Sequence, residues 1–184
     1  MADLILKTKS KRIRFNVIRE KCEIEKIVKG LPGDDEVLKV ISYGGFSSIG
    51  FVQFIASKTK INRMSVSTLR VGKKHLKCLD MLYRQGKLGY VRFLIGNVMK
   101  NDSKTGLRYG YYDNLQSICD KNDWDVVEKT NHSKILLFAT ELGKFVIETS
   151  SNLNENPNME QFSFEKNDEL YDFYNQIFDE QFLK

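Results

Sequence analysis

The segment from residue 131 to 162 holds the side chains best suited to chemistry on a phosphate group. A single serine separates His132 from Lys134, so an extended chain would project both side chains to the same side. An imidazole can attack phosphorus as a nucleophile or carry a proton near neutral pH. A lysine beside it stabilises the negative charge that develops on phosphoryl oxygens. The pair therefore predicts a site that handles phosphate.

Two apolar runs after this pair predict a β-hairpin. Residues 135–138 are expected to form a buried strand and 145–147 its partner, with the turn at 141–144. The second strand would bring Ser150 and Asn152 back towards the start of the first. A hydroxyl and an amide would then join the imidazole and the ammonium. A lone His-x-Lys is usually part of an ordinary surface hairpin, but four convergent polar groups favour a functional site.

The order of these residues resembles the catalytic motif of the phospholipase D superfamily, in particular its small nuclease-like members with a single motif. The matching residues are His132, Lys134, Ser150, Asn152, Asn158 and Glu160. The resemblance implies that His132 attacks a phosphodiester and forms a phosphohistidine. It implies that Lys134 and Asn152 bind phosphate oxygens, that Glu160 orients the histidine, and that Ser150 and Asn158 bind substrate. It implies no metal ion or other cofactor.

The chain carries one copy of this motif. Phosphodiester transfer also needs a group that protonates the leaving oxygen. Single-motif members of the superfamily place two motifs face to face across the two-fold axis of a homodimer. The resemblance therefore implies a homodimer in which one His132 attacks and the His132 of the second protomer acts as the acid.

The chain departs from the family pattern at two places, Ala139 and Thr149-Ser150, which stands where the family usually has Gly-Ser, and these departures keep other functions open. The family usually has an aspartate five residues after the lysine, where this chain has Ala139. The leading hypothesis is a phosphodiesterase or endonuclease that acts on nucleic acid. The alternative is a catalytically inactive relative that binds nucleic acid through the same pocket. A third hypothesis is a module that uses the fold as a scaffold for binding another protein.

Length and composition are those of a globular protein. The chain has 184 residues, of which 41% are hydrophobic and only 2 are prolines, which argues against low-complexity disorder. No apolar run approaches the roughly 20 residues that span a bilayer, and the first residues do not match a secretory signal. The cysteines are scattered and odd in number, which fits free thiols in a reducing compartment. We therefore expect a cytoplasmic protein without membrane contact.

Positive charge is concentrated in three stretches. The net charge is +5, with basic residues clustered at 7–21, 58–74 and 100–108, whereas 165–180 is acidic. Separate basic clusters can converge into a groove for nucleic-acid phosphates. Nucleic acid is thus the expected partner, with DNA favoured over RNA. Ordinary solvated lysines are the alternative interpretation.

Strands alternate with helices along the chain and predict an α/β fold, a mixed sheet flanked by helices. The expected strands are 37–42, 61–71, 89–98 and a cluster that opens at 124; the expected helices are 46–57, 72–85, 111–121 and 168–182. Residues 35–184 are predicted as the phospholipase D-like domain. Residues 1–34 are predicted as a basic N-terminal extension, either a dimerisation element or a DNA contact.

A glycine-rich turn at 42–48 joins the first expected strand to its helix. Backbone N–H groups at such a helix start bind anions, so Ser47 and Ser48 are candidate substrate-binding residues. A simple capped turn is the alternative. Arg70, at the end of the next strand, is expected at the pocket mouth. His75 is expected on the protein surface among lysines.

Overall fold

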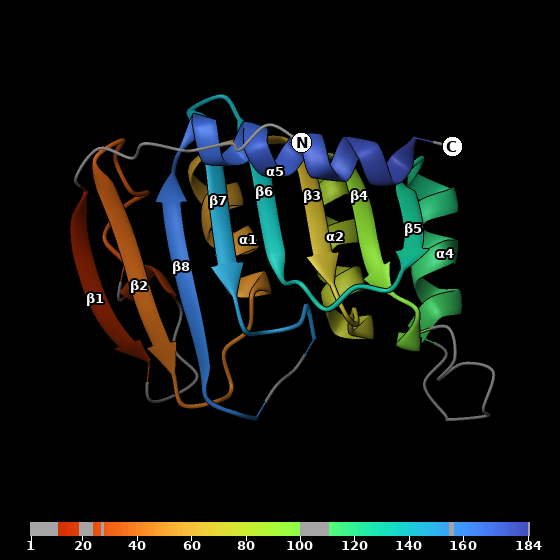
Figure 1. Ribbon diagram of the computed structural model, residues 1–184, viewed down its shortest axis with the longest axis horizontal. Helices are drawn as coiled ribbons and strands as arrows, with labels where there is room; N and C mark the ends of the chain where they lie inside the picture. The colour runs from red at the N-terminus through yellow and green to blue at the C-terminus, as the bar shows by residue number, and fades with distance from the viewer. Residues whose placement is uncertain (1–10, 19–23, 27, 100–110, 155–156, 184) are drawn as a thin grey trace.

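An eight-stranded mixed β-sheet runs through the whole molecule, in the order β1-β2-β8-β7-β6-β3-β4-β5 (Figure 1). The computed structural model describes residues 11–18, 24–26, 28–99, 111–154 and 157–183. The strands are β1 (Arg12–Ile18), β2 (Glu36–Ser42), β3 (Ile61–Thr68), β4 (Leu88–Gly96), β5 (Asp125–Lys129), β6 (Ile135–Thr140), β7 (Gly143–Thr149) and β8 (Glu160–Lys166). The predicted mixed α/β architecture is confirmed.

Strand directions bring several chain ends to one edge of the sheet. β1 and β2 are parallel to each other, as are β3, β4 and β5, while β6, β7 and β8 form an antiparallel meander between these groups. β2 is antiparallel to β8, and β3 is antiparallel to β6. Therefore β2, β3, β4 and β7 end where β6 and β8 begin. We call this the site edge; it lies at the bottom in Figure 1.

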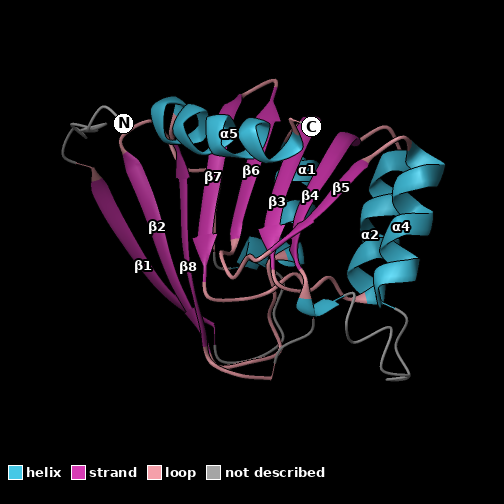
Figure 2. Ribbon diagram, turned by 45° about the vertical axis from the view of Figure 1, so that its right-hand side comes forward, coloured by secondary structure: helices cyan, strands magenta, loops and turns pink. Residues whose placement is uncertain are grey.

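Helices cover both faces of the sheet. α1 (Ile49–Lys58), α2 (Lys73–Arg84) and α4 (Tyr111–Asn122) lie on one face, and α5 (Asp168–Phe182) crosses the other (Figure 2). A short 3-10 helix, η1 (Ile24–Lys26), precedes β2. Both α1 and α2 begin at the site edge because each follows a strand that ends there. Among the described helices, none is both long and apolar enough to cross a membrane.

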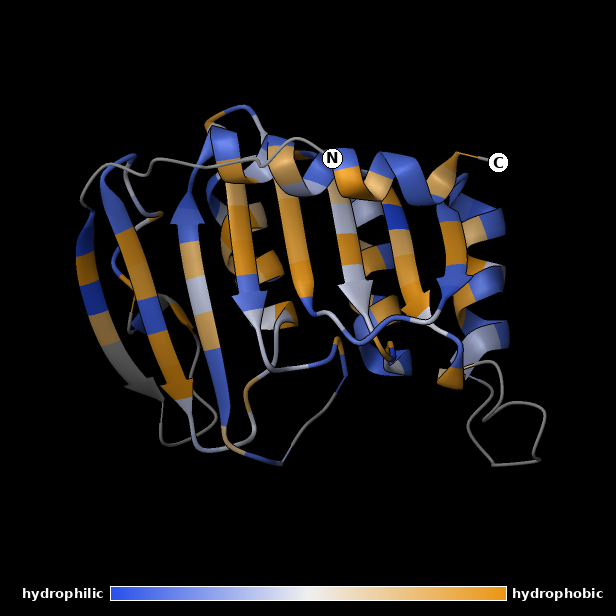
Figure 3. Ribbon diagram, viewed as in Figure 1, coloured by the Kyte–Doolittle hydropathy of each residue, from blue (hydrophilic) through white to orange (hydrophobic). Residues whose placement is uncertain are grey.

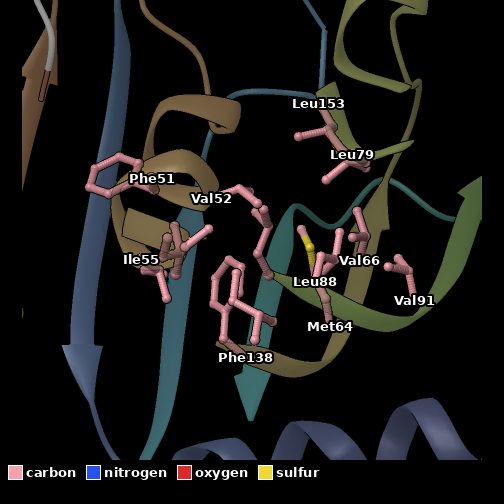
Figure 4. Packing of buried hydrophobic residues seen from close by; sticks show 14 of the residues in the cluster. Phe51, Val52, Ile55, Met64, Val66, Leu79, Leu88, Val91, Phe138 and Leu153 are labelled. Carbon is pink, nitrogen blue, oxygen red and sulfur yellow. The ribbon is translucent and has the colours of Figure 1, made fainter. Parts of the chain in front are cut away.

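Alternating side chains supply a core on each side of the sheet, and the strands show the corresponding hydrophobic bands (Figure 3). In β6, Leu136 and Phe138 join the large core with α1 and α2, whereas Leu137 joins the smaller core under α5. Figure 4 shows Phe138 close to Val52 and Ile55 of α1. This tight packing holds the strand and helix ends rigidly at the site edge.

An aromatic cluster positions the turn before α1. The Phe46 ring lies edge-on to those of Phe51 and Phe162, with ring centroids 5.4 Å apart in both pairs. Phe46 is 7% exposed, so the turn is anchored to the core from within. Ser47 is the next residue, so the anchored turn also fixes its position.

The structure alters three expectations about individual elements. Glu160, the glutamate of the motif, lies in β8, a strand that the sequence does not predict. β1, within the expected N-terminal extension, pairs in parallel with β2. On α5, the apolar spacing predicts Ile177 on the same side as Leu170, Phe173, Tyr174 and Phe178, but Ile177 is 40% exposed, while Tyr171 is 4% exposed. The side of α5 that faces the sheet contacts the buried Arg92 of β4 through Asn175, Phe178, Asp179 and Phe182.

Candidate functional site

His132 and Lys134 lie together in the loop that leads into β6. The Lys134 Nζ is 3.2 Å from His132 Nδ1 and donates a hydrogen bond to the His132 carbonyl at 2.6 Å. His132 is exposed, and Lys134 is half-buried. The ammonium and the imidazole therefore lie side by side at the site edge, where both can contact the same anion.

A polar network fixes the loop that carries the histidine. Asn131 Nδ2 donates to the Ser67 hydroxyl at 2.9 Å and to the Leu94 carbonyl at 3.1 Å. The Ser133 hydroxyl donates to Asn131 Oδ1 at 2.8 Å and lies 2.5 Å from the Ser67 hydroxyl. Ser67 is 1% exposed. Asn131 was not assigned a role from the sequence, although an asparagine directly before a candidate catalytic residue is a signal for such a loop bond.

Glu160 begins β8 at the site edge. It is 7% exposed and accepts a hydrogen bond from the Ser150 hydroxyl. Burial lowers the pKa of Lys134, and the negative charge of Glu160 opposes that shift. The carboxylate is therefore close enough to Lys134 to stabilise its ammonium, which keeps a positive charge available for a phosphate.

Asn152 is oriented by the end of β3. Its Oδ1 accepts hydrogen bonds from the Leu69 backbone N–H at 3.2 Å and from the Thr68 hydroxyl at 3.4 Å. The Thr68 hydroxyl in turn accepts a hydrogen bond from the Leu153 N–H at 3.1 Å. Because its oxygen is engaged by the protein, the amide presents its two N–H donors on the other side. That orientation suits an anionic ligand.

The hairpin brings these segments together as predicted. The Thr149 N–H donates to the Lys134 carbonyl at 3.1 Å, and the Ser150 N–H donates to the Gln161 carbonyl at 3.2 Å. The end of β7 thus lies beside the start of β6 on one side and the start of β8 on the other. Asn158, by contrast, is exposed on the approach to β8.

His75 is not on the surface, and that expectation was wrong. It is 4% exposed, and its Nε2 lies 2.8 Å from the Ser47 hydroxyl. The flanking lysines suggested an exposed helix start, but the first turn of α2 packs against the turn before α1. The backbone at Gly72 approaches so closely that a Cβ there would lie 3.1 Å from His75 Nδ1.

The remaining candidate residues surround the two helix starts. Ser48 caps α1 without a side-chain hydrogen bond. Within the described part of the chain, the hydroxyls of Ser48 and Ser42 have no hydrogen-bond partner, and both residues are 0% exposed. Arg70 is half-buried in the loop between β3 and α2. Ser47, Ser48 and Arg70 therefore lie at the same edge as His132.

A broad hollow opens beside Lys134. Its volume is about 730 Å³, and its lining includes Phe15, Lys39, Ile41, Lys134, Glu148 and Gln161. It lies on β2, β8 and β7, where α5 does not cover the sheet (Figure 1). Lys134 thus connects the candidate site to an open face of the molecule.

Comparisons with known proteins identify the fold. No family model matches the chain, and no curated protein sequence matches it. Among solved structures, the chain is similar to Nuc from Salmonella typhimurium, a phospholipase D family member, with TM-score 0.56 and 15% identity over 79% of this chain and 94% of Nuc.

Two larger enzymes contain the same arrangement of strands and helices. Polyphosphate kinase from Porphyromonas gingivalis matches with TM-score 0.61 and 10% identity over 85% of this chain, and phosphatidylserine synthase from Haemophilus influenzae Rd KW20 with TM-score 0.52 and 16% identity over 79%. The chain spans only 28% of the kinase and 37% of the synthase. The arrangement of sheet and helices is thus similar to that of a phospholipase D family member.

Proposed function

We propose that the protein is a phosphodiesterase that cleaves nucleic acid through a covalent intermediate on His132. The observation that carries the proposal is the contact between Lys134 and His132, with Nζ and Nδ1 3.2 Å apart on an ordered loop. In the proposed reaction His132 attacks phosphorus, and Lys134 and Asn152 stabilise charge on the non-bridging oxygens. The likeness in fold to Nuc supports phosphodiester chemistry.

Glu160 has a supporting role in this proposal. Its charge favours protonated Lys134, and Ser150 keeps its carboxylate in place. A buried carboxylate close to the site would also stabilise the positive charge that the imidazole acquires as His132 attacks phosphorus.

A second candidate function is phosphate-directed binding without turnover. Ala139 favours it because the family pattern has an aspartate there. Ala139 lies in β6, opposite Arg63 of β3 and Lys144 of β7, and these pairs lie at the edge remote from His132. A substitution so far from the histidine is compatible with catalysis, so the active enzyme remains the first choice.

A homodimer is the assembly we propose. Among the described residues, no helix covers the face of β1, β2 and β8 that is turned to the viewer in Figure 1, and on β1 Ile13 is 53% and Phe15 77% exposed. Apolar side chains beside an open hollow are typical of an interface. Sedimentation equilibrium of the wild type and of Phe15→Lys tests this: we expect a dimer that the lysine dissociates, and a monomeric wild type contradicts it.

A cleavage assay in EDTA tests the reaction. Purified protein is incubated with single- and double-stranded DNA and RNA beside His132→Ala and, as a matched control, a variant of a similarly exposed residue, Gln161→Ala. We expect metal-independent cleavage that His132→Ala abolishes and Gln161→Ala retains. Trapping of the covalent phosphoryl adduct on His132 by rapid quench in alkaline denaturant, in which the N–P bond is stable, would identify the intermediate.

The outcomes separate the two functions. Cleavage that survives in His132→Ala contradicts the proposal. DNA binding without cleavage, weakened by Lys134→Ala in a salt-dependent manner, favours the binding module.

A further inference from the structure

His75 is the second of only two histidines in the chain, and both lie at the site edge. His132 stands in the loop before β6, whereas His75 lies in the first helical turn after β3. Histidine is the side chain best suited to transfer protons near neutral pH. A buried second histidine beside a candidate phosphoryl-transfer site therefore calls for a physical explanation.

The surroundings of His75 tie it to the segment that carries Asn152. The Gly72 N–H donates to the Leu153 carbonyl at 2.8 Å. A Cβ placed on Gly72 would lie 3.1 Å from His75 Nδ1 and 3.2 Å from Asn154. The imidazole therefore packs beside residues 152–154, the segment whose asparagine is oriented for a phosphate.

The Ser47 hydroxyl has an unusual partner for its position. Serine at a helix start normally accepts a hydrogen bond from a backbone N–H of the first turn. At the start of α1, Ser48 makes no such bond, and the Ser47 hydroxyl instead lies 2.8 Å from His75 Nε2. The serine is half-buried while the histidine is 4% exposed. The hydroxyl is thus the accessible end of a pair whose imidazole is shielded.

We propose that Ser47 and His75 form a proton relay that protonates the leaving oxygen when His132 attacks the phosphodiester. The inference rests on the proposed function and assigns its general acid. As the bond from His132 nitrogen to phosphorus forms, the bond from phosphorus to the leaving oxygen breaks. The Ser47 hydroxyl gives its proton to that oxygen and takes one from Nε2 of a protonated His75, which is left as a neutral imidazole. In hydrolysis of the phosphohistidine, water returns a proton through Ser47 to His75.

With this relay, each chain would supply its own general acid. The resemblance assigns that role to the His132 of a second protomer, but here the chain has its own second histidine at the same edge. A homodimer would then stabilise the sheet face without supplying the proton.

The test compares two substrates that differ only in their need for an acid. A thymidine dinucleotide releases an alkoxide, which must be protonated, whereas thymidine 5′-(p-nitrophenyl phosphate) releases a stable phenolate. The variants are Ser47→Ala and His75→Gln. Glutamine retains a hydrogen-bond donor towards Ser47 but cannot transfer a proton. Circular dichroism and urea unfolding verify that each variant is folded.

We expect His75→Gln to slow cleavage of the dinucleotide by roughly 10²- to 10⁴-fold, the usual contribution of a general acid, and that of the nitrophenyl ester by no more than about threefold. Ser47→Ala should show the same selectivity. Equal losses on both substrates would overturn the relay in favour of a structural role. Dinucleotide cleavage that His75→Gln retains at the wild-type rate would overturn it as well. A wild type that cleaves only the nitrophenyl ester also contradicts the relay but not the nucleophile, and one that cleaves neither contradicts the proposed function itself.

Discussion

The Arg92 guanidinium of β4 is buried beneath α5, with its Nη1 2.5 Å from Asp179 Oδ1. Arg92 is 2% exposed. Its Nη2 donates to Asn175 Oδ1 at 2.9 Å, and its guanidinium carbon lies 5.2 Å from the centroid of Phe178 and 5.3 Å from that of Phe182. A charge so deep in the fold requires this set of partners. They determine which side of α5 faces the sheet.

Asp179→Ala should destabilise the protein because it leaves the Arg92 cation without its carboxylate. We expect a loss of about 2 kcal/mol in the free energy of unfolding, below the range for fully buried pairs because Asp179 is partly exposed. The matched control is Asp172→Ala on the same helix, whose partner Lys144 is more exposed; there the loss should stay below about 0.5 kcal/mol. Urea unfolding measures both losses. Equal losses would contradict the stabilising role of the contact between Asp179 and Arg92.

Asp80 should make the contact between α2 and α4 dependent on pH. Burial raises the pKa of this carboxyl, but hydrogen bonds from Lys121 and Asn122 and the charges of Arg84 and Lys121 outweigh burial, so the pKa is lowered overall. A carboxyl with a lowered folded-state pKa stabilises the protein above its unfolded pKa, and this stabilisation is lost as pH falls.

The wild type should therefore exceed Asp80→Asn by about 1 kcal/mol at neutral pH. The difference should shrink towards zero below roughly pH 4, where the unfolded carboxyl is protonated. Urea unfolding of both proteins at several pH values checks this. A difference that does not change with pH would show that packing, not charge, is responsible.

Gly44→Ala should displace the turn that carries Ser47. Gly44 has φ +98°, and an added Cβ would lie 2.3 Å from the Pro157 carbonyl oxygen. The matched control is Gly86→Ala, with φ +70° but no atom within 4 Å of the added Cβ. The control should lose about 1 kcal/mol from backbone strain alone, and Gly44→Ala more than about 2 kcal/mol together with its cleavage activity. Similar behaviour of the two variants in unfolding and cleavage assays would contradict the close approach of Gly44 to the Pro157 carbonyl.

Asn152→Asp should weaken phosphate binding while the fold is retained. The carboxylate can still accept from the Leu69 N–H, but both outward N–H donors are replaced by an acceptor with negative charge. We expect an increase in KM for the nucleic-acid substrate of roughly 100-fold, equivalent to about 2.7 kcal/mol. Asn154→Asp adds the same charge nearby without removing those donors and should have a smaller effect. Steady-state kinetics distinguish the two, and equal effects would mean that charge alone matters.

Local patterns in the sequence determined most of the helices and strands. The apolar spacing of α2 predicts Leu76, Leu79, Met81 and Leu82 on its core side; the three leucines are buried, whereas Met81 is 46% exposed. The hairpin of β6 and β7 was also predictable, because two short apolar runs joined by a turn have few alternative arrangements. The grouping of His132 and Lys134 with Ser150 and Asn152 followed from that hairpin.

Tertiary structure alone decided which polar side chains meet across the sheet. Asn152 contacts Thr68 and Leu69 because β6 pairs with β3, a pairing between segments distant in sequence. His75 was mistaken for a surface residue because only the packing of α2 against the turn before α1 buries it. Likewise, Tyr171 rather than Ile177 faces the sheet on α5 because Arg92 of β4 lies beneath that helix. Local periodicity indicates which residues share one face of a helix or strand. What that face contacts depends on long-range packing, and this packing assembled the candidate site.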